Sequence, residues 1–156
     1  MHKYVATVEW QRNGDAFAGN RYSRAHAWRF DGGVTVAASA SPQVVRAPFS
    51  VEAAVDPEEA LIASASSCHM LSFLYIAALD GYVVDRYVDE AYGLLERIER
   101  RKMAVTRIVL RPKIEFSGER LPSAEELAHL HHRAHEECFI ANSLKTEIVV
   151  EPPEEI

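Results

Sequence analysis

The chain has 156 residues, of which 48% are hydrophobic and 26% charged, and its formal net charge is −6. This composition is typical of a soluble globular protein with one domain over residues 1–156, and the lack of a basic stretch argues against nucleic-acid binding. Two cysteines are too few for a secreted disulfide scaffold, and the first ten residues lack the apolar core of a signal peptide, so we expect a cytoplasmic protein.

The N-terminal region alternates between apolar and polar residues, as strands do. This alternation predicts strands over 4–10 and 21–30, with a turn-rich connection between them. The Asp-Gly-Gly sequence at 31–33 predicts a hairpin turn, after which residues 34–39 return as the partner strand. Residues 40–55 contain two prolines and predict a loop.

One face of the strand predicted at 21–30 is aromatic and yet carries an arginine. With a period of two residues, this face consists of Tyr22, Arg24, His26, Trp28 and Phe30. Arginine is almost never buried without a partner. Arg24 therefore either forms a structural salt bridge or snorkels to the surface, or it holds an anion such as a thiolate.

A long helix is predicted over residues 56–79. Asp56 suits the N-cap, Pro57 the first helical position and Glu59 a capping box, and Gly81 follows the helix as a C-cap.

The middle of this helix is free of charge. Residues 60–79 contain no Asp, Glu, Lys or Arg and are long enough to cross a bilayer. Four serines, His69 and the absence of basic flanks favour the buried helix of a protein over a membrane span, so we expect no membrane partner. Because the helix has more apolar surface than one small sheet can cover, we expect a dimer.

The stretch after the helix is less regular. Residues 82–100 follow neither the two-residue period of a strand nor the 3.6-residue period of a helix clearly, so we assign them to neither. Residues 105–116 alternate as one half-exposed strand, in which Pro112 indicates an edge or a bulge.

The C-terminal part predicts a second helix over 122–138, which Ser123 caps with Glu126 three residues on. A strand over 144–151 follows, and residues 152–156 form a frayed tail. The order of these elements predicts a single α+β domain with antiparallel sheets.

The two cysteines occupy different surroundings. Cys68 lies in the middle of the uncharged helix, where it is either a small buried hydrophobe or a reactive thiol. Cys138 ends the second helix beside Glu136 and Glu137, and acidic neighbours raise the pKa of a thiol. Such a thiol suits a resolving role better than an attacking one, because the attacking group must be a thiolate.

A carboxylate and a histidine cluster provide further candidates. Glu58 in the first helical turn either stabilises the helix dipole or fixes an arginine that faces a thiolate. His131, His135 and Cys138 lie along one helix face, where two of them at a time could hold zinc. The three span about 10 Å of helix, which is too far for all of them to bind one ion.

The two cysteine segments resemble a known family. The sequence "DPEEALIASASSCHM" resembles the first cysteine motif of the OsmC/Ohr family, and "AHEECFIANSLKTEI" resembles its second. The segment "YSRAHAWRFDGG" is similar to the N-terminal hairpin of OsmC-like proteins. Together these matches cover nearly the whole chain in the family's order.

The resemblance implies an OsmC-like fold in which antiparallel sheets pack around long central helices. It also implies an intertwined homodimer with two active sites at its interface, and reduction of organic hydroperoxides without a metal or prosthetic group.

Residue by residue, the resemblance makes Cys68 the peroxidatic cysteine, Cys138 the resolving cysteine and Glu58 the active-site glutamate. Arg24 matches the hairpin arginine, and Arg46 in the following loop is its rival.

From these parts we expect a peroxidase cycle. Attack of Cys68 on the peroxide gives a sulfenic acid, a disulfide with Cys138 follows, and an external dithiol restores the thiols. Tyr22, Trp28 and Phe30 are expected to supply an apolar pocket. Two departures from the family, His69 after the nucleophile and Phe139 where many members have proline, bear on substrate preference and rate.

Two other functions remain open at this point. The chain is alternatively a non-catalytic or regulatory stress-associated dimer, or a metal-binding protein that uses its helical histidines and cysteine.

Overall fold

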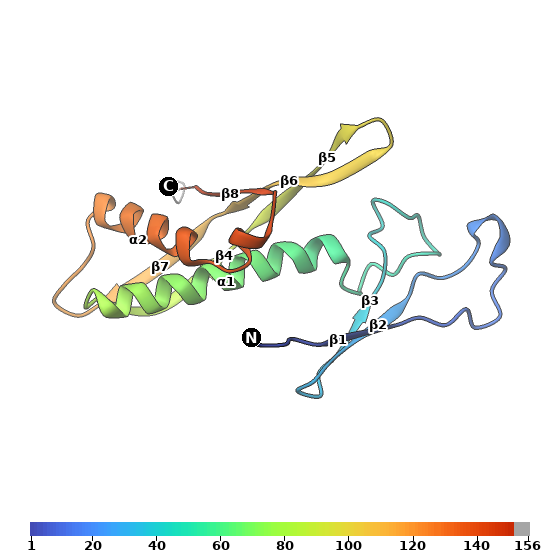
Figure 1. Cartoon of the computed structure of the whole chain (residues 1–156), viewed down its shortest axis with the longest axis horizontal. Helices are drawn as coiled ribbons and strands as arrows, with labels where there is room; N and C mark the ends of the chain where they lie inside the picture. The colour runs from blue at the N-terminus through green and yellow to red at the C-terminus, as the bar shows by residue number, and fades with distance from the viewer. Residues whose placement is uncertain (152–156) are drawn as a thin grey trace. The chain divides into compact units, whose positions relative to one another are not determined.

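The computed structural model describes residues 1–151, which form two compact units, Met1–Ala60 and the chain from Leu61 onward. The molecule is a mixed α+β protein with helices and antiparallel sheets, so the predicted fold class is confirmed (Figure 1). The frayed tail predicted at 152–156 lies outside the described residues, and the single domain over 1–156 stays a prediction.

The first unit contains a three-stranded antiparallel sheet in the order β1-β2-β3. Its strands are β1 (Ala6–Glu9), β2 (His26–Phe30) and β3 (Thr35–Ala38), and a short 3-10 helix, η1 (Ala18–Asn20), lies between the first two. Trp28 in the central strand stands opposite Val8 on one side and Val36 on the other.

The strand predicted at 21–30 is wrong in its first half. Residues 21–25 are not part of the β1-β2-β3 sheet, because their backbone groups form hydrogen bonds outside it. The Ser23 N–H donates to the Asp15 carboxylate at 2.8 Å, and the Arg24 N–H donates to the Phe49 carbonyl at 2.8 Å. Arg24 therefore stands on a loop before β2 and not on a regular strand face.

The long helix α1 (Pro57–Leu79) begins and ends as predicted. The Glu59 N–H donates to Asp56 Oδ1 at 2.8 Å, and the Asp56 N–H donates to Glu59 Oε2 at 3.2 Å, which forms a capping box. At the other end Gly81 has a φ of +81°, and the Tyr82 N–H donates to the Ala77 carbonyl at 2.9 Å. This is the Schellman bond, which glycine allows because it lacks a Cβ.

Residues 61–151 of the second unit hold five strands in two sheets. The antiparallel pair β4-β7 forms one sheet, and β5-β6-β8 forms the other, in which β8 runs parallel to β6. The strands are β4 (Val83–Asp89), β5 (Tyr92–Glu99), β6 (Lys102–Leu110), β7 (Pro112–Ser117) and β8 (Glu147–Val150). The unassigned residues 82–100 thus form two strands, and the all-antiparallel expectation fails at β8.

The single strand predicted over 105–116 is also wrong. The chain passes from one sheet to the other at Arg111, whose N–H donates to Asp89 Oδ1 at 2.7 Å. Ile108, Val109 and Leu110 are all buried in succession. One face of this stretch packs against α1 and the opposite face is buried as well, so neither face is exposed to solvent and the alternation disappears.

The second helix, α2 (Ala124–Glu137), is confirmed together with its capping box between Ser123 and Glu126. A short 3-10 helix, η2 (Ala141–Ser143), follows it and leads to β8. The two long helices lie side by side and run antiparallel (Figure 1).

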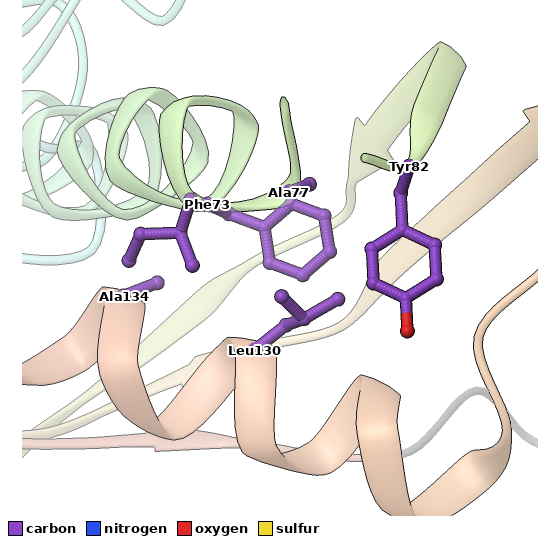
Figure 2. Packing of buried hydrophobic residues seen from close by; sticks show 6 residues of the cluster. Phe73, Ala77, Tyr82, Leu130 and Ala134 are labelled. Atoms are coloured by element: carbon purple, nitrogen blue, oxygen red, sulfur yellow. The ribbon is translucent and has the colours of Figure 1, made fainter. Parts of the chain in front are cut away.

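A buried contact joins these helices, and we call it the α1–α2 seam. Phe73 and Ala77 of α1 face Leu130 and Ala134 of α2 in this contact (Figure 2). Tyr82 closes the end of the cluster, and all of these side chains are buried. The seam thus aligns the residues of α1 with those of α2.

The opposite face of α1 is exposed in the described part of the second unit. Leu71, Tyr75 and Leu79 follow a spacing of four residues and are 61%, 62% and 64% exposed. Among residues 1–151, α1 is the one helix long and apolar enough to cross a membrane. The sequence predicted that α1 is buried, and this is confirmed only for the face that packs against α2.

Candidate functional site

The second unit brings the two cysteines together. Cys68 lies half-buried on α1, whereas Cys138 caps the C-terminus of α2 and is 1% exposed. Both are free thiols. The Cys138 sulfur accepts a hydrogen bond from the Ala141 N–H at 3.4 Å, and the Cys68 thiol lies close enough to raise the pKa of Cys138.

This environment keeps Cys138 protonated. Burial is the largest cause that raises the pKa of Cys138, and the Cys68 thiol raises it further, whereas the Ala141 N–H acts in the opposite direction. The raised pKa agrees with the sequence-based expectation, but its causes are burial and Cys68 and not the neighbouring glutamates. A buried thiol of this kind is a poor first nucleophile and remains available for a second step.

A pair of buried histidines lies along the same seam. His69 Nε2 and His131 Nδ1 are 3.0 Å apart, and the two rings meet edge to edge, with 13° between their planes and 5.3 Å between their centroids. The ring of Phe73 stacks on His131 at 4.5 Å. His69 is 1% exposed, and its Nδ1 has no hydrogen-bond partner within residues 1–151.

Both imidazoles are neutral at pH 7. Burial lowers the pKa of His131 to about 4. Burial also lowers the pKa of His69 to about 4, with smaller contributions from His131 and His135. The sequence analysis identified each of these histidines but not their pairing, because they are 62 residues apart and sequence periodicity does not show which helices meet.

The metal-site hypothesis finds no support in this geometry. Across residues 1–151, no group of three or more His, Cys, Asp or Glu side chains is arranged to hold a metal ion. His131 instead directs its Nδ1 at His69, and Cys138 interacts with Cys68.

The predicted arginine lies in the first unit, where the Arg24 guanidinium stacks 3.8 Å from the centre of the Tyr22 ring. The same guanidinium donates to the Asn20 carbonyl at 2.9 Å and to the Tyr22 carbonyl. The side chain is half-buried, so its charge is stabilised by backbone dipoles and by an aromatic face, and no carboxylate among the described residues pairs with it.

Arg24 borders an open pocket of about 490 Å³ in the first unit. The pocket is lined by Val8, Trp10, Phe17, Tyr22, Arg24, His26, Ser39, Ala40 and Pro57. Of the three aromatic residues expected there, Tyr22 is present, but Trp28 and Phe30 are not.

Trp10 and Phe17 take the places of the two missing rings and pack against Tyr22, with ring centroids 5.5 Å and 4.7 Å away. Phe17 comes from the connection between β1 and β2, where no periodicity could have identified it.

Glu58 lies in the first turn of α1, next to the pocket residue Pro57. Its Oε2 is buried and accepts no hydrogen bond from any described residue. No ion pair joins Glu58 to Arg24 in the described part of the chain, and Arg46 is exposed. The roles predicted for Arg24, Arg46 and Glu58 therefore stay predictions.

The sequence from residue 50 to residue 152 matches the family model described as "OsmC-like protein". The chain belongs to the OsmC-like protein family. This OsmC-like chain is also 54% identical to a solved OsmC-like protein of unknown function from Vibrio cholerae, with a TM-score of 0.94 over 97% of this chain and 99% of that one.

More distant solved structures share the OsmC-like fold. An organic hydroperoxide resistance protein from Elizabethkingia anophelis is 15% identical with a TM-score of 0.73, and covers 99% of this chain and 98% of its own. A second such protein, from Legionella pneumophila, is 14% identical with a TM-score of 0.65, over 98% and 96%. No curated protein matches the chain.

From the histidine pair we predict that the free energy of unfolding decreases in acid. A histidine has a pKa of 6.5 when exposed and about 4 here, so the unfolded chain binds more protons at intermediate pH. The stability contributed by the neutral pair is complete above pH 6.5 and is lost as the pH falls towards 4. We expect a loss on the order of a few kcal/mol in the free energy of unfolding, measured by urea denaturation across this range.

The control is the double variant His69→Leu/His131→Leu, which keeps His135 and both thiols. Its free energy of unfolding should fall less steeply between pH 6.5 and 4 than that of the wild type. If the free energy of unfolding fell equally steeply with pH in the two proteins, His69 and His131 would not be the source of the acid sensitivity.

Proposed function

We propose that the chain is a thiol-dependent peroxidase that reduces organic hydroperoxides to alcohols. One observation carries the proposal: two free thiols from different helices lie close together in the second unit, and burial raises the pKa of one of them, Cys138. Solved proteins with the same fold are named as organic hydroperoxide resistance proteins, which supports the choice of substrate class.

The cycle has three steps. The Cys68 thiolate attacks the distal oxygen of the hydroperoxide, the O–O bond breaks, and the proximal oxygen takes a proton and leaves as an alcohol. The Cys138 sulfur then attacks the Cys68 sulfenic acid, forming the disulfide and releasing water with the Cys138 proton. Thiol–disulfide exchange with an external dithiol returns both cysteines to thiols.

Arg24 and Glu58 are proposed to assist the first step. A guanidinium stabilises a thiolate and the charge that develops on the leaving oxygen. A carboxylate oriented towards it fixes its position, and Glu58 has a buried oxygen without a partner that suits this role. The aromatic pocket beside Arg24 offers apolar surface to the organic part of the peroxide.

A homodimer completes the proposal. Glu58 and Cys68 are ten residues apart on α1, or about 15 Å of helix rise, so the carboxylate does not reach the thiol along its own helix. The exposed apolar stripe of Leu71, Tyr75 and Leu79 offers a surface on which a second copy would pack. In the proposed isologous dimer, the first unit of one chain supplies Arg24 and Glu58 to the thiols of the other.

The cycle needs no metal or prosthetic group, because the two sulfurs supply both electrons. A reducing compartment suits an enzyme that depends on an external dithiol, so we place the protein in the cytoplasm.

The two cysteines should behave differently towards an organic hydroperoxide such as cumene hydroperoxide. Cys68→Ser should abolish peroxide consumption, because no nucleophile remains. Cys138→Ser should still react once and leave a sulfenic acid that a dione probe labels at residue 68. Mass spectrometry and a dithiol-coupled peroxide assay measure both outcomes.

Equal residual activity in the two cysteine variants would contradict the roles. A wild-type protein that consumes no peroxide at all would favour the alternative of a non-catalytic stress-associated dimer whose thiols only pack.

The active-site arginine can be identified by a matched pair of variants. Arg24→Met retains the apolar stem but removes the charge, and should lower the second-order rate with peroxide by about a hundredfold or more. Arg46→Met removes a charge from an exposed side chain and should change the rate by less than about twofold. Stopped-flow kinetics of Cys68 oxidation measures both, and the reverse order would assign the role to Arg46.

The dimer depends on the exposed stripe of α1. We expect light scattering at micromolar concentration to give twice the chain mass of 17.5 kDa. Tyr75→Glu places a charge in the middle of the stripe and should yield a monomer, whereas Glu115→Gln on the exposed face of β7 should not. A wild-type chain that is monomeric at this concentration would exclude the dimer.

A further inference from the structure

The histidine pair is the contact next to the thiol pair along the α1–α2 seam. His69 follows Cys68 directly on α1, and His131 lies two turns before Cys138 on α2. Beyond the histidines come the apolar contacts of Phe73 with His131 and Leu130. Along the α1–α2 seam, the contact between the thiols is thus followed by the contact between the imidazoles and then by the apolar contacts.

The imidazole contact permits fewer arrangements than the apolar ones. A buried polar group that loses its hydrogen-bond partner costs stability, and each of these neutral rings can either donate or accept through the nitrogen that faces the other. A shift of α1 by one turn, about 5.4 Å, would separate His69 Nε2 from His131 Nδ1. Apolar side chains such as Phe73 and Leu130 would find other apolar neighbours after the same shift.

A buried polar pair of this kind can fix the register of two helices, as single polar residues do in coiled coils. We propose that His69 and His131 are positioning residues for disulfide formation, and that their hydrogen bond holds α1 against α2 so that the Cys68 thiol faces the Cys138 thiol. This inference rests on the proposed function for its biological purpose, since disulfide formation is the second step of the cycle.

The test uses an oxidant other than peroxide. Oxidised dithiothreitol is a cyclic disulfide that accepts two electrons and two protons from the cysteine pair and leaves as the reduced dithiol. The protein gains the Cys68–Cys138 bond in exchange. Acid quenching, alkylation of the remaining thiols and mass spectrometry give the rate and the equilibrium constant of disulfide formation.

The variants separate hydrogen bonding from packing. His69→Leu and His131→Leu remove one partner each. His69→Gln places an amide close to the position of Nε2, and His131→Asn places one close to Nδ1, so both can keep the bond. Ile76→Val removes a methylene from the buried seam without touching the pair.

We expect disulfide formation to be about tenfold slower in each Leu variant. The Gln and Asn variants should stay within about twofold of the wild type. Ile76→Val should lower the melting temperature without slowing the reaction.

If a single Leu variant does not fold, the double variant His69→Leu/His131→Leu replaces it, because it leaves no polar group unpaired. It should fold and still form the disulfide slowly.

Three results would overturn the proposal: Leu variants that react as fast as the wild type, a Gln variant as slow as the Leu variant, or an equal slowing by Ile76→Val. A wild-type protein that forms the disulfide with oxidised dithiothreitol but does not react with peroxide would refute the proposed function and leave this inference standing.

Discussion

The burial of one face of α1 against α2 is the contact on which the second unit depends. Phe73, Ile76 and Leu130 are buried there, and each such side chain contributes about 1.5–3 kcal/mol through its removal from water. The capping boxes set where each helix begins, and the apolar faces set which sides meet. Within this contact, the proposed role of the His69–His131 pair is to set the register in which Cys68 faces Cys138.

The same removal from water sets the chemistry of the seam. Burial raises the pKa of the Cys138 thiol and lowers the pKa of His69 and His131. Burial disfavours the charged form in each case, so both histidines and Cys138 are uncharged at neutral pH. A charge that develops during the reaction is then stabilised only by groups outside the seam. For this reason the proposed mechanism needs a guanidinium, and Arg24 is favoured over the exposed Arg46 because it is half-buried and borders the aromatic pocket.

The parts of the fold that local sequence determines could be predicted, and the parts that tertiary contacts determine could not. Both helices were predicted with their ends, because caps such as Asp56 and Ser123 are local signals. The division of residues 102–117 between two sheets could not be read from alternation, because Ile108 and Leu110 of β6 are buried against residues that are distant in sequence, such as Ala65 of α1. The thiol pair came from the family resemblance, and no sequence pattern showed the pairing of His69 with His131 or the place of Phe17 beside Tyr22.

The two proposed chemical steps, attack on the peroxide and disulfide formation, use residues from different parts of the molecule. Disulfide formation joins two residues of the second unit, and its geometry belongs to a seam inside one chain. In the proposed mechanism, attack on the peroxide also uses Arg24 and Glu58, which belong to the first unit. In the proposed dimer, the first step therefore depends on assembly and the second does not. A chain kept monomeric would form its disulfide with a small oxidant and yet react poorly with a hydroperoxide, because the sulfur would keep its partner thiol and lose the charge that stabilises the leaving oxygen.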